Sequence, residues 1–193
     1  ETWEQLGLEG TERIAQVAVN PQDGNTVYVC ATGGAFADSP ERGVFRTKDA
    51  GKTWEKVLYV APDTGCADLD LDPADPSQVY ASMWQFRRRP DFFTSGGPKS
   101  GLFKSTDGGS TWKAIRQGLP AGDLGRIAIA VAPSAPATVY ATVDTSAGAA
   151  STGLRLAAGS VTQPATGISW LVVRATATGT PGAIYILPEL IVF

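Results

Sequence analysis

The sequence predicts an all-β fold, a partial β-propeller of four-stranded antiparallel blades. An eight-residue turn occurs twice, at residues 47–54 and 105–112, and each copy follows a strand of the form Gly-apolar-Phe-basic. A longer pattern occurs three times, at residues 14–31, 67–83 and 127–143: an apolar strand, a turn containing Pro, and a second strand that begins with Val-Tyr. A period near 50 residues is typical of propellers and solenoids, whose units bury their faces only against neighbouring units.

Each fixed position of the short turn, which reads Ser/Thr-x-Asp-x-Gly-x-Thr-Trp, has a mechanical role in a hairpin. Asp accepts backbone N–H bonds inside the turn, and Gly adopts a φ that other residues resist. Thr starts the return strand, and Trp covers the turn with a large apolar face. The residues at these structural positions are Thr47, Asp49, Gly51, Thr53 and Trp54 in one copy and Ser105, Asp107, Gly109, Thr111 and Trp112 in the other.

The longer repeat predicts the strand order within each blade. Residues 14–20, 67–72 and 127–132 are expected to form the innermost strands, which line the central channel. The eight-residue turns are expected to join the two outermost strands, at the opposite end from the loops that link blades. Thr2-Trp3 repeats the Thr-Trp of the turn, so residues 1–144 are predicted to hold the end of one blade, two full blades and the start of another.

The length of the chain limits the ring that it can form. Closed propellers need about 4 to 8 blades, and at about 50 residues each the chain holds fewer than four. We therefore expect part of a propeller, or a unit that completes its ring by self-association or with another chain, because open blade edges associate. Residues 145–193 break the pattern, with Glu189 as their single acidic residue, and are predicted to be an irregular or degenerate C-terminal segment. Two explanations of this segment are open: a degenerate blade, or a native continuation that a shifted reading frame or a truncation replaced.

These motifs resemble those of the Asp-box (BNR repeat) β-propellers, and within that superfamily the sortilin/VPS10-like bacterial group of glycosyl-hydrolase type. The resemblance covers roughly residues 1–144. It implies the fold, while activity does not follow from fold alone. The function that it favours is a non-catalytic, extracytoplasmic binding propeller of sortilin-like type that recognises a protein, peptide or glycan. The alternatives are a sialidase-like or xyloglucanase-like glycoside hydrolase fragment and a factor that only binds another protein during assembly.

Composition narrows the chemistry and the partners. The net charge of −3 gives no basis for binding nucleic acid, and the apolar end at residues 183–193 is too short to insert across a bilayer. The absence of His removes Ser-His-Asp and Cys-His catalysis and His-based metal sites, so no metal and no cofactor is expected. The chain shows no signal peptide of its own, which is consistent with one that was removed.

The two cysteines, Cys30 and Cys66, are expected near the same end of neighbouring blades. A disulfide between them is open, and two buried free thiols are the favoured expectation.

The strongest candidate for a ligand-binding face is the loop at residues 82–93. Three consecutive Arg residues beside Trp and Phe can hold a carboxylate sugar, a sulfated glycan or a peptide C-terminus by bidentate bonds and stacking. The alternative is that the Arg side chains pair with nearby acids while the aromatic rings pack the loop down. The candidate ligand-binding residues are Arg13, Arg42, Trp84, Arg87, Arg88, Arg89, Phe92, Phe93 and Arg126.

Asp68 and Asp70 are weaker candidates for catalysis. They share one face of a predicted inner strand, where two carboxylates can act as the acid and base of glycoside hydrolysis. Two residues of one strand rarely approach a substrate from both sides. The favoured expectation is that these carboxylates accept backbone N–H bonds or pair with Arg13 or Arg126.

Overall fold

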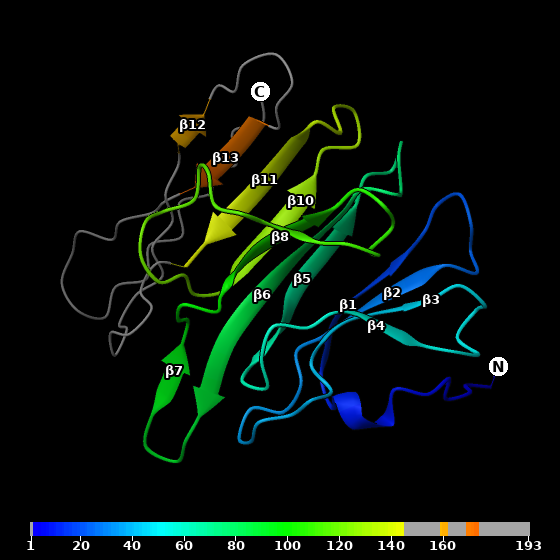
Figure 1. Ribbon diagram of the computed structural model, residues 1–193, viewed down its shortest axis with the longest axis horizontal. Helices are drawn as coiled ribbons and strands as arrows, with labels where there is room; N and C mark the ends of the chain where they lie inside the picture. Colours follow the sequence, from blue (N-terminus) through cyan, green and yellow to red (C-terminus); the bar gives the residue numbers. More distant parts are fainter. Residues whose placement is uncertain (1, 145–158, 162–168, 174–193) are drawn as a thin grey trace.

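The computed structural model describes residues 2–144, 159–161 and 169–173, and its strands form three sheets that lie side by side (Figure 1). Blade 1 has the order β1-β2-β3-β4, with the 3-10 turn η1 (Glu9–Thr11) before it. Its strands are β1 (Ile14–Val19), β2 (Val27–Ala31), β3 (Gly43–Thr47) and β4 (Glu55–Leu58). Blade 2 has the order β5-β6-β8-β9, and β7 pairs with the far half of β6. Its strands are β5 (Thr64–Leu71), β6 (Val79–Arg88), β7 (Phe93–Ser95), β8 (Gly101–Ser105) and β9 (Lys113–Ile115).

The third sheet begins like a blade and then departs from the blade pattern. Its order is β10-β11-β13-β12, formed by β10 (Ile127–Val131), β11 (Thr138–Val143), β13 (Ser169–Val173) and β12 (Gly159–Val161). β10 and β11 are antiparallel, whereas β13 lies parallel to β11. The predicted all-β, partial-propeller fold is confirmed, and β1, β5 and β10 are the expected inner strands. The prediction for residues 145–193 lies outside the described residues except for these two short strands.

Apolar layers between the sheets hold them together. Tyr28, Cys30 and Val44 of blade 1 pack with Leu69 and Val79 of blade 2 in one buried cluster. A second cluster joins blade 2 to the third sheet. It contains Tyr80, Leu102, Ile127, Val139 and Ala141. The middle sheet is therefore covered on both faces, by blade 1 and by the third sheet.

The two eight-residue turns, which we call the box turns (residues 47–54 and 105–112), have the same hydrogen bonds. The Asp49 carboxylate accepts the Thr53 N–H at 2.9 Å and the Thr53 hydroxyl at 2.7 Å. Asp107 and Thr111 repeat both bonds, at 2.8 and 2.6 Å. The conformation at the centre of the turn is also shared, since Ala50 has φ 58° and Gly108 has φ 67°.

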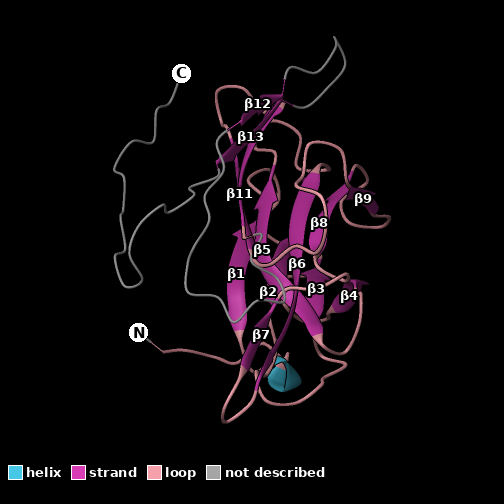
Figure 2. Cartoon of the chain, turned by 90° about the vertical axis from the view of Figure 1, so that its left-hand side faces the viewer, coloured by secondary structure: helices cyan, strands magenta, loops and turns pink. Residues whose placement is uncertain are grey.

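The box turns and the blade-linking loops lie at opposite ends of the strands. At the box end, Ala50 N–H donates to the Asn25 carbonyl at 3.0 Å, so the first box turn contacts the turn between β1 and β2. The loop end carries residues 32–42, 59–63, 86–100 and 116–126. Figure 2 shows β7 and η1 together at this end. The prediction of a loop over residues 82–93 was wrong for most of its length, because β6 continues to Arg88 and β7 begins at Phe93, which leaves a short hairpin turn at residues 89–92. The expected position of that turn away from the box turns agrees with the structure.

Candidate ligand-binding face

Two Arg side chains flank a pair of stacked aromatic rings at the loop end, and the four residues come from all three sheets. The Arg42 guanidinium lies over the Phe86 ring at 4.5 Å, and Phe86 stacks on Trp84 with 4.3 Å between ring centroids. Arg126 lies over the Trp84 ring at 5.7 Å. Residues two apart on a strand share a face, which puts Trp84 and Phe86 of β6 in line. We call these four residues the cation–aromatic stack.

The stack brings together three candidates that are distant in the sequence and adds one that the sequence analysis missed. Arg42 precedes β3 in blade 1, Trp84 belongs to β6 in blade 2, and Arg126 precedes β10 in the third sheet. Phe86 lies in the segment that the sequence predicted as a loop, but it belongs to β6. Because β6 continues to Arg88, the alternation of Trp84 and Phe86 is the signal that identifies it.

Arg42 is completely buried. Its Nη2 donates to the carbonyl oxygens of Gly34 and Ala37, the latter at 3.0 Å. Its Nε and Nη1 have no hydrogen-bond partner among the described residues. Burial lowers the pKa of this guanidinium, and the positive charge of Arg87 lowers it further. A buried charge that only neutral carbonyls satisfy is costly, so this Arg depends on the aromatic ring beside it.

Arg87 attaches a neighbouring loop to β6. Its guanidinium pairs with Asp38 and donates to the Phe36 carbonyl at 3.1 Å, while Arg88 N–H donates to the Ala35 carbonyl at 2.9 Å. The alternative reading, in which an Arg of this run pairs with a nearby acid, therefore describes Arg87.

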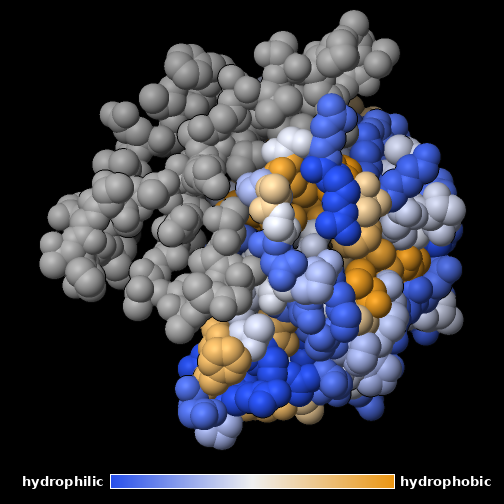
Figure 3. Space-filling model, turned by 60° about the vertical axis from the view of Figure 1, so that its left-hand side comes forward, coloured by the Kyte–Doolittle hydropathy of each residue, from blue (hydrophilic) through white to orange (hydrophobic). Residues whose placement is uncertain are grey.

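The tip of the β6–β7 hairpin is the exposed part of the candidate face. Arg88, Arg89, Phe92 and Phe93 are all exposed, and the Arg88 guanidinium lies over the Phe93 ring at 5.5 Å. Figure 3 shows apolar and strongly hydrophilic surface side by side at this lower end. The hairpin turn is held by mutual backbone bonds between Arg89 and Phe92. Cationic and apolar groups are thus presented together.

Arg13 is exposed at the same end but lies outside the stack. Its carbonyl accepts the N–H groups of Thr32 and Gly33 at 2.8 and 3.2 Å, which closes the start of β1 against the end of β2.

Asp68 and Asp70 bind the backbone of two sheets at once. Asp68 accepts the Leu69 N–H at 2.9 Å and, across the junction, the Ile129 N–H at 2.8 Å. Asp70 repeats the arrangement with its own neighbour and with Val131 N–H, both at 2.8 Å. Burial raises the pKa of Asp68, although the hydrogen bonds from Ile129 and Leu69 oppose the shift. Both carboxylates thus accept backbone N–H bonds, as the favoured expectation stated.

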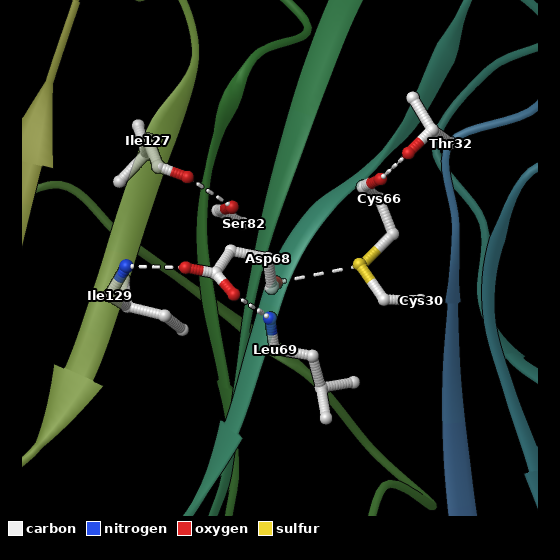
Figure 4. The surroundings of a disulfide bond; sticks show 8 residues. All are labelled: Cys30, Thr32, Cys66, Asp68, Leu69, Ser82, Ile127 and Ile129. Atoms are coloured by element: carbon white, nitrogen blue, oxygen red, sulfur yellow. Dashed lines mark hydrogen bonds between the residues drawn. A yellow bond between two sulfur atoms is a disulfide. The ribbon is translucent and has the colours of Figure 1, made fainter. Parts of the chain in front are cut away.

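The expectation of two free thiols was wrong, because Cys30 and Cys66 form a disulfide with 5.0 Å between their Cα atoms (Figure 4). The bond joins β2 of blade 1 to β5 of blade 2. Close contact of these two segments explains it: Thr32 Oγ1 donates to the Cys66 carbonyl at 2.8 Å, and a Cβ on Gly65 would collide with the Thr32 carbonyl. The sequence predicted that the two Cys residues lie near the same end of neighbouring blades, but it did not predict how closely the two strands approach each other.

No helix among the described residues is long and apolar enough to cross a membrane. No cluster of three or more acidic or Cys side chains that could hold a metal ion occurs in the same residues.

Comparison with protein families identifies the chain. The Sortilin-Vps10 family, described as "Sortilin, neurotensin receptor 3", matches residues 1–121. The chain belongs to this family. The match covers both complete blades and stops before β10 of the third sheet.

Individual relatives of this Sortilin-Vps10 chain are of two kinds. A vacuolar protein sorting/targeting protein 10 from Colletotrichum graminicola is 29% identical over 51% of the chain and 5% of its own length. A xyloglucanase from Hypocrea jecorina is 31% identical over 58% of the chain and 12% of its own length. Xyloglucanase Xgh74A from Acetivibrio thermocellus is 27% identical over 64% of the chain and 16% of its own length. The chain thus spans a sixth or less of these relatives.

Solved structures give distant similarity. An ancestral GH74 enzyme has a TM-score of 0.47 and 16% identity, over 67% of this chain and 16% of that one. A GH74 enzyme from Niastella koreensis has a TM-score of 0.47 and 18% identity, over 65% of this chain and 17% of that one.

Proposed function

We propose that this Sortilin-Vps10 chain is a non-catalytic binding propeller that recognises an anionic peptide, protein or glycan at its loop end. The observation that supports the proposal is the row of exposed or half-buried cationic and aromatic side chains at the loop end, from Arg126 and Trp84 to the hairpin tip, with the buried Arg42 and Phe86 holding Trp84 in place from behind. The exposed tip with Arg88, Arg89, Phe92 and Phe93 extends this face.

The chemistry of these groups favours an anionic ligand with apolar or ring surfaces. Arg forms bidentate bonds with carboxylate and sulfate groups, and it binds most strongly where water is partly excluded. Phe92 and Phe93 provide exposed aromatic surface next to Arg88 and Arg89. Ligand binding then depends on salt, since part of the attraction is between exposed charges.

The second candidate function is glycoside hydrolysis, which the similarity to xyloglucanases favours. In this reading Asp68 and Asp70 act as catalytic carboxylates, or the catalytic groups come from a larger protein. Their hydrogen bonds to Ile129 and Val131 N–H favour the binding function, because they give both carboxylates a structural role.

We further propose that the chain works outside the cytoplasm, in a periplasmic or secreted setting. The Cys30–Cys66 disulfide supports this location, because such bonds persist in oxidising compartments and are rare where thiols are kept reduced.

The binding function is tested on glycan and peptide arrays, followed by titration of the best ligand. The variant R88A/R89A removes two exposed charges at the hairpin tip, and we expect binding to fall at least tenfold. K113A is the matched control, because it removes an exposed charge from β9, away from the loop end. Equal loss in both variants, or no ligand on either array, would contradict the proposal.

The hydrolase function is tested separately with xyloglucan oligosaccharides. It requires turnover by the chain that D68N and D70N abolish while the fold is retained. Absence of turnover would remove this candidate, and turnover that survives both substitutions would remove the two carboxylates from it.

A further inference from the structure

The tip of the β6–β7 hairpin and the loop beside it present three aromatic rings to solvent. Phe36, Phe92 and Phe93 are 66%, 51% and 40% exposed. The residue 36 loop lies against the hairpin, because Arg87 donates to the Phe36 carbonyl. Blade 2 packs on a sheet at each side, so this exposure does not arise at an end of the chain. We call Phe36 and residues 88–93 the tip patch.

Two cations of the tip patch lack an acidic partner among the described residues. Arg87 pairs with Asp38, whereas Arg88 and Arg89 are exposed and form no ion pair there. Asp91 is the single acid of the patch, which leaves one net positive charge. The whole chain carries −3, so an anionic surface is attracted to this patch and not to the protein in general.

The backbone of the tip suits a medium that is less polar than water. Arg89 and Phe92 exchange N–H···O bonds of 2.7 and 3.4 Å across the hairpin turn. Arg88 N–H donates to the Ala35 carbonyl at 2.9 Å, and Pro90 has no N–H to satisfy. Because an unpaired backbone group is costly away from water, these bonds lower the cost of placing the tip at an apolar boundary.

The shape of the tip patch disfavours a small ligand. Sites for small ligands are concave, whereas the β6–β7 hairpin projects at the lower end of the molecule (Figure 1). The Phe93 ring meets the Trp84 ring edge-on at 5.9 Å, which holds this projection against the sheet. Apart from its charged groups, the segment 88–93 has no polar side chain, so it offers few bonds to the hydroxyl groups of a neutral sugar.

We propose that the tip patch docks the protein on a bilayer that contains anionic lipids. The Phe rings enter the boundary between headgroups and acyl chains, and Arg88 and Arg89 bind the anionic headgroups above it. Such a contact is interfacial and needs no segment that crosses the membrane. It goes beyond the proposed function, which concerns a soluble ligand, and it does not involve Arg126 or Trp84 directly.

Co-sedimentation of the full chain with vesicles tests the charged part of the contact. We expect binding to vesicles of phosphatidylcholine with phosphatidylglycerol and much weaker binding to phosphatidylcholine alone. R88Q/R89Q should lower binding about 25-fold, since each Arg near an anionic surface contributes about fivefold. K48Q/K52Q is the matched control, because it removes two exposed charges from the first box turn, at the opposite end. D91N should raise binding, because it removes the acid of the tip.

The aromatic part is tested at Phe92. F92S should lower binding about tenfold, because the ring no longer leaves water. F92W should keep the binding and add fluorescence that brominated lipids quench, which reports entry into the boundary. W3S is the matched control, since Trp3 is 99% exposed and lies near the N-terminus, away from the hairpin (Figure 1).

Three results would overturn the proposal: no binding of the unchanged chain to anionic vesicles, equal binding to both kinds of vesicle, or equal losses in R88Q/R89Q and K48Q/K52Q. The soluble ligand is titrated without vesicles, so the two proposals fail separately. A chain that binds an array ligand through Arg88 and Arg89 but ignores anionic vesicles would overturn the docking and support the proposed function.

Discussion

The junction between blades 1 and 2 and the junction between blade 2 and the third sheet both hold neighbouring sheets together, but through different bonds. Cys30 in β2 is bonded covalently to Cys66 of the next sheet. The matching position in β6 is Ser82, whose hydroxyl donates to the Ile127 carbonyl of the next sheet at 2.7 Å. The first junction thus has a covalent bond where the second has a hydrogen bond.

For the inner strands, the stronger side-chain bonding is at the second junction instead of the first. Asp68 and Asp70 hold β10 through its backbone N–H groups, while Gln16 and Ala18 stand at the matching places of β1. The comparison teaches that the repeat fixes where neighbouring sheets touch and leaves the bonding at each contact free to differ.

The largest expected effect comes from removing the covalent bond at the first junction. C30A/C66A should lower the free energy of unfolding by about 3 kcal/mol, because the unfolded chain is no longer constrained. Denaturant unfolding with and without reductant measures the loss. The unchanged chain under reductant should lose stability to the same extent, and a variant whose midpoint equals that of the oxidised chain would contradict the assigned role.

Loss of the carboxylates at the second junction ranks next. D68N/D70N should cost about 2 kcal/mol, since hydrogen bonds to charged groups contribute more than neutral ones.

Hydrogen exchange gives the decisive measurement for these carboxylates. The Ile129 and Val131 amides should exchange faster in D68N/D70N, while amides in blade 1 keep their protection. D123N is the control at an exposed acid. Unchanged exchange at both amides would contradict the bridging role.

Single hydroxyl groups should have smaller and similar effects at the two junctions. S82A and Y28F should each cost about 1 kcal/mol, because each removes one donor to a carbonyl of the next sheet. Thermal unfolding compares them directly. A loss at one junction only would show that the two contacts are not equivalent.

Acid should weaken the box turns last and by the smallest amount, because both carboxylates are exposed to solvent. Bonds from the Thr53 hydroxyl, then from Thr47, lower the pKa of Asp49 to about 2, and those of Thr111 lower the pKa of Asp107 well below its ordinary value. A lowered pKa means that the contribution is complete above pH 3.8 and disappears as pH falls through about 2. D49N should flatten the stability profile across this interval. A profile parallel to that of the unchanged chain would contradict this.

Sequence reasoning predicted the parts of the molecule that repeat. The paired box turns and the Val-Tyr strands gave the inner strands, the blade order and the ends at which loops and turns lie. Local hydrogen bonding explains this success, since a turn such as that of Asp49 and Thr53 is determined within a few residues.

The contacts between sheets were harder to predict. The Cys30–Cys66 bond depends on the approach of Gly65 to Thr32, and the stack of Arg42 on Phe86 depends on how the residue 32–42 loop folds over β6. These are single-copy features, and no repeat in the chain encodes them. The roles of the predicted ligand-binding residues stay predictions.

The position of the disulfide also determines what a protease can release. The bond spans 36 residues and encloses the β3–β4 hairpin, whose first box turn exposes Lys48 and Lys52. Exposed turns with small and polar residues are preferred sites of cleavage. A cut at either Lys would leave the two pieces of the chain covalently joined, so the nicked protein would run as one species on a non-reducing gel and as two after reduction.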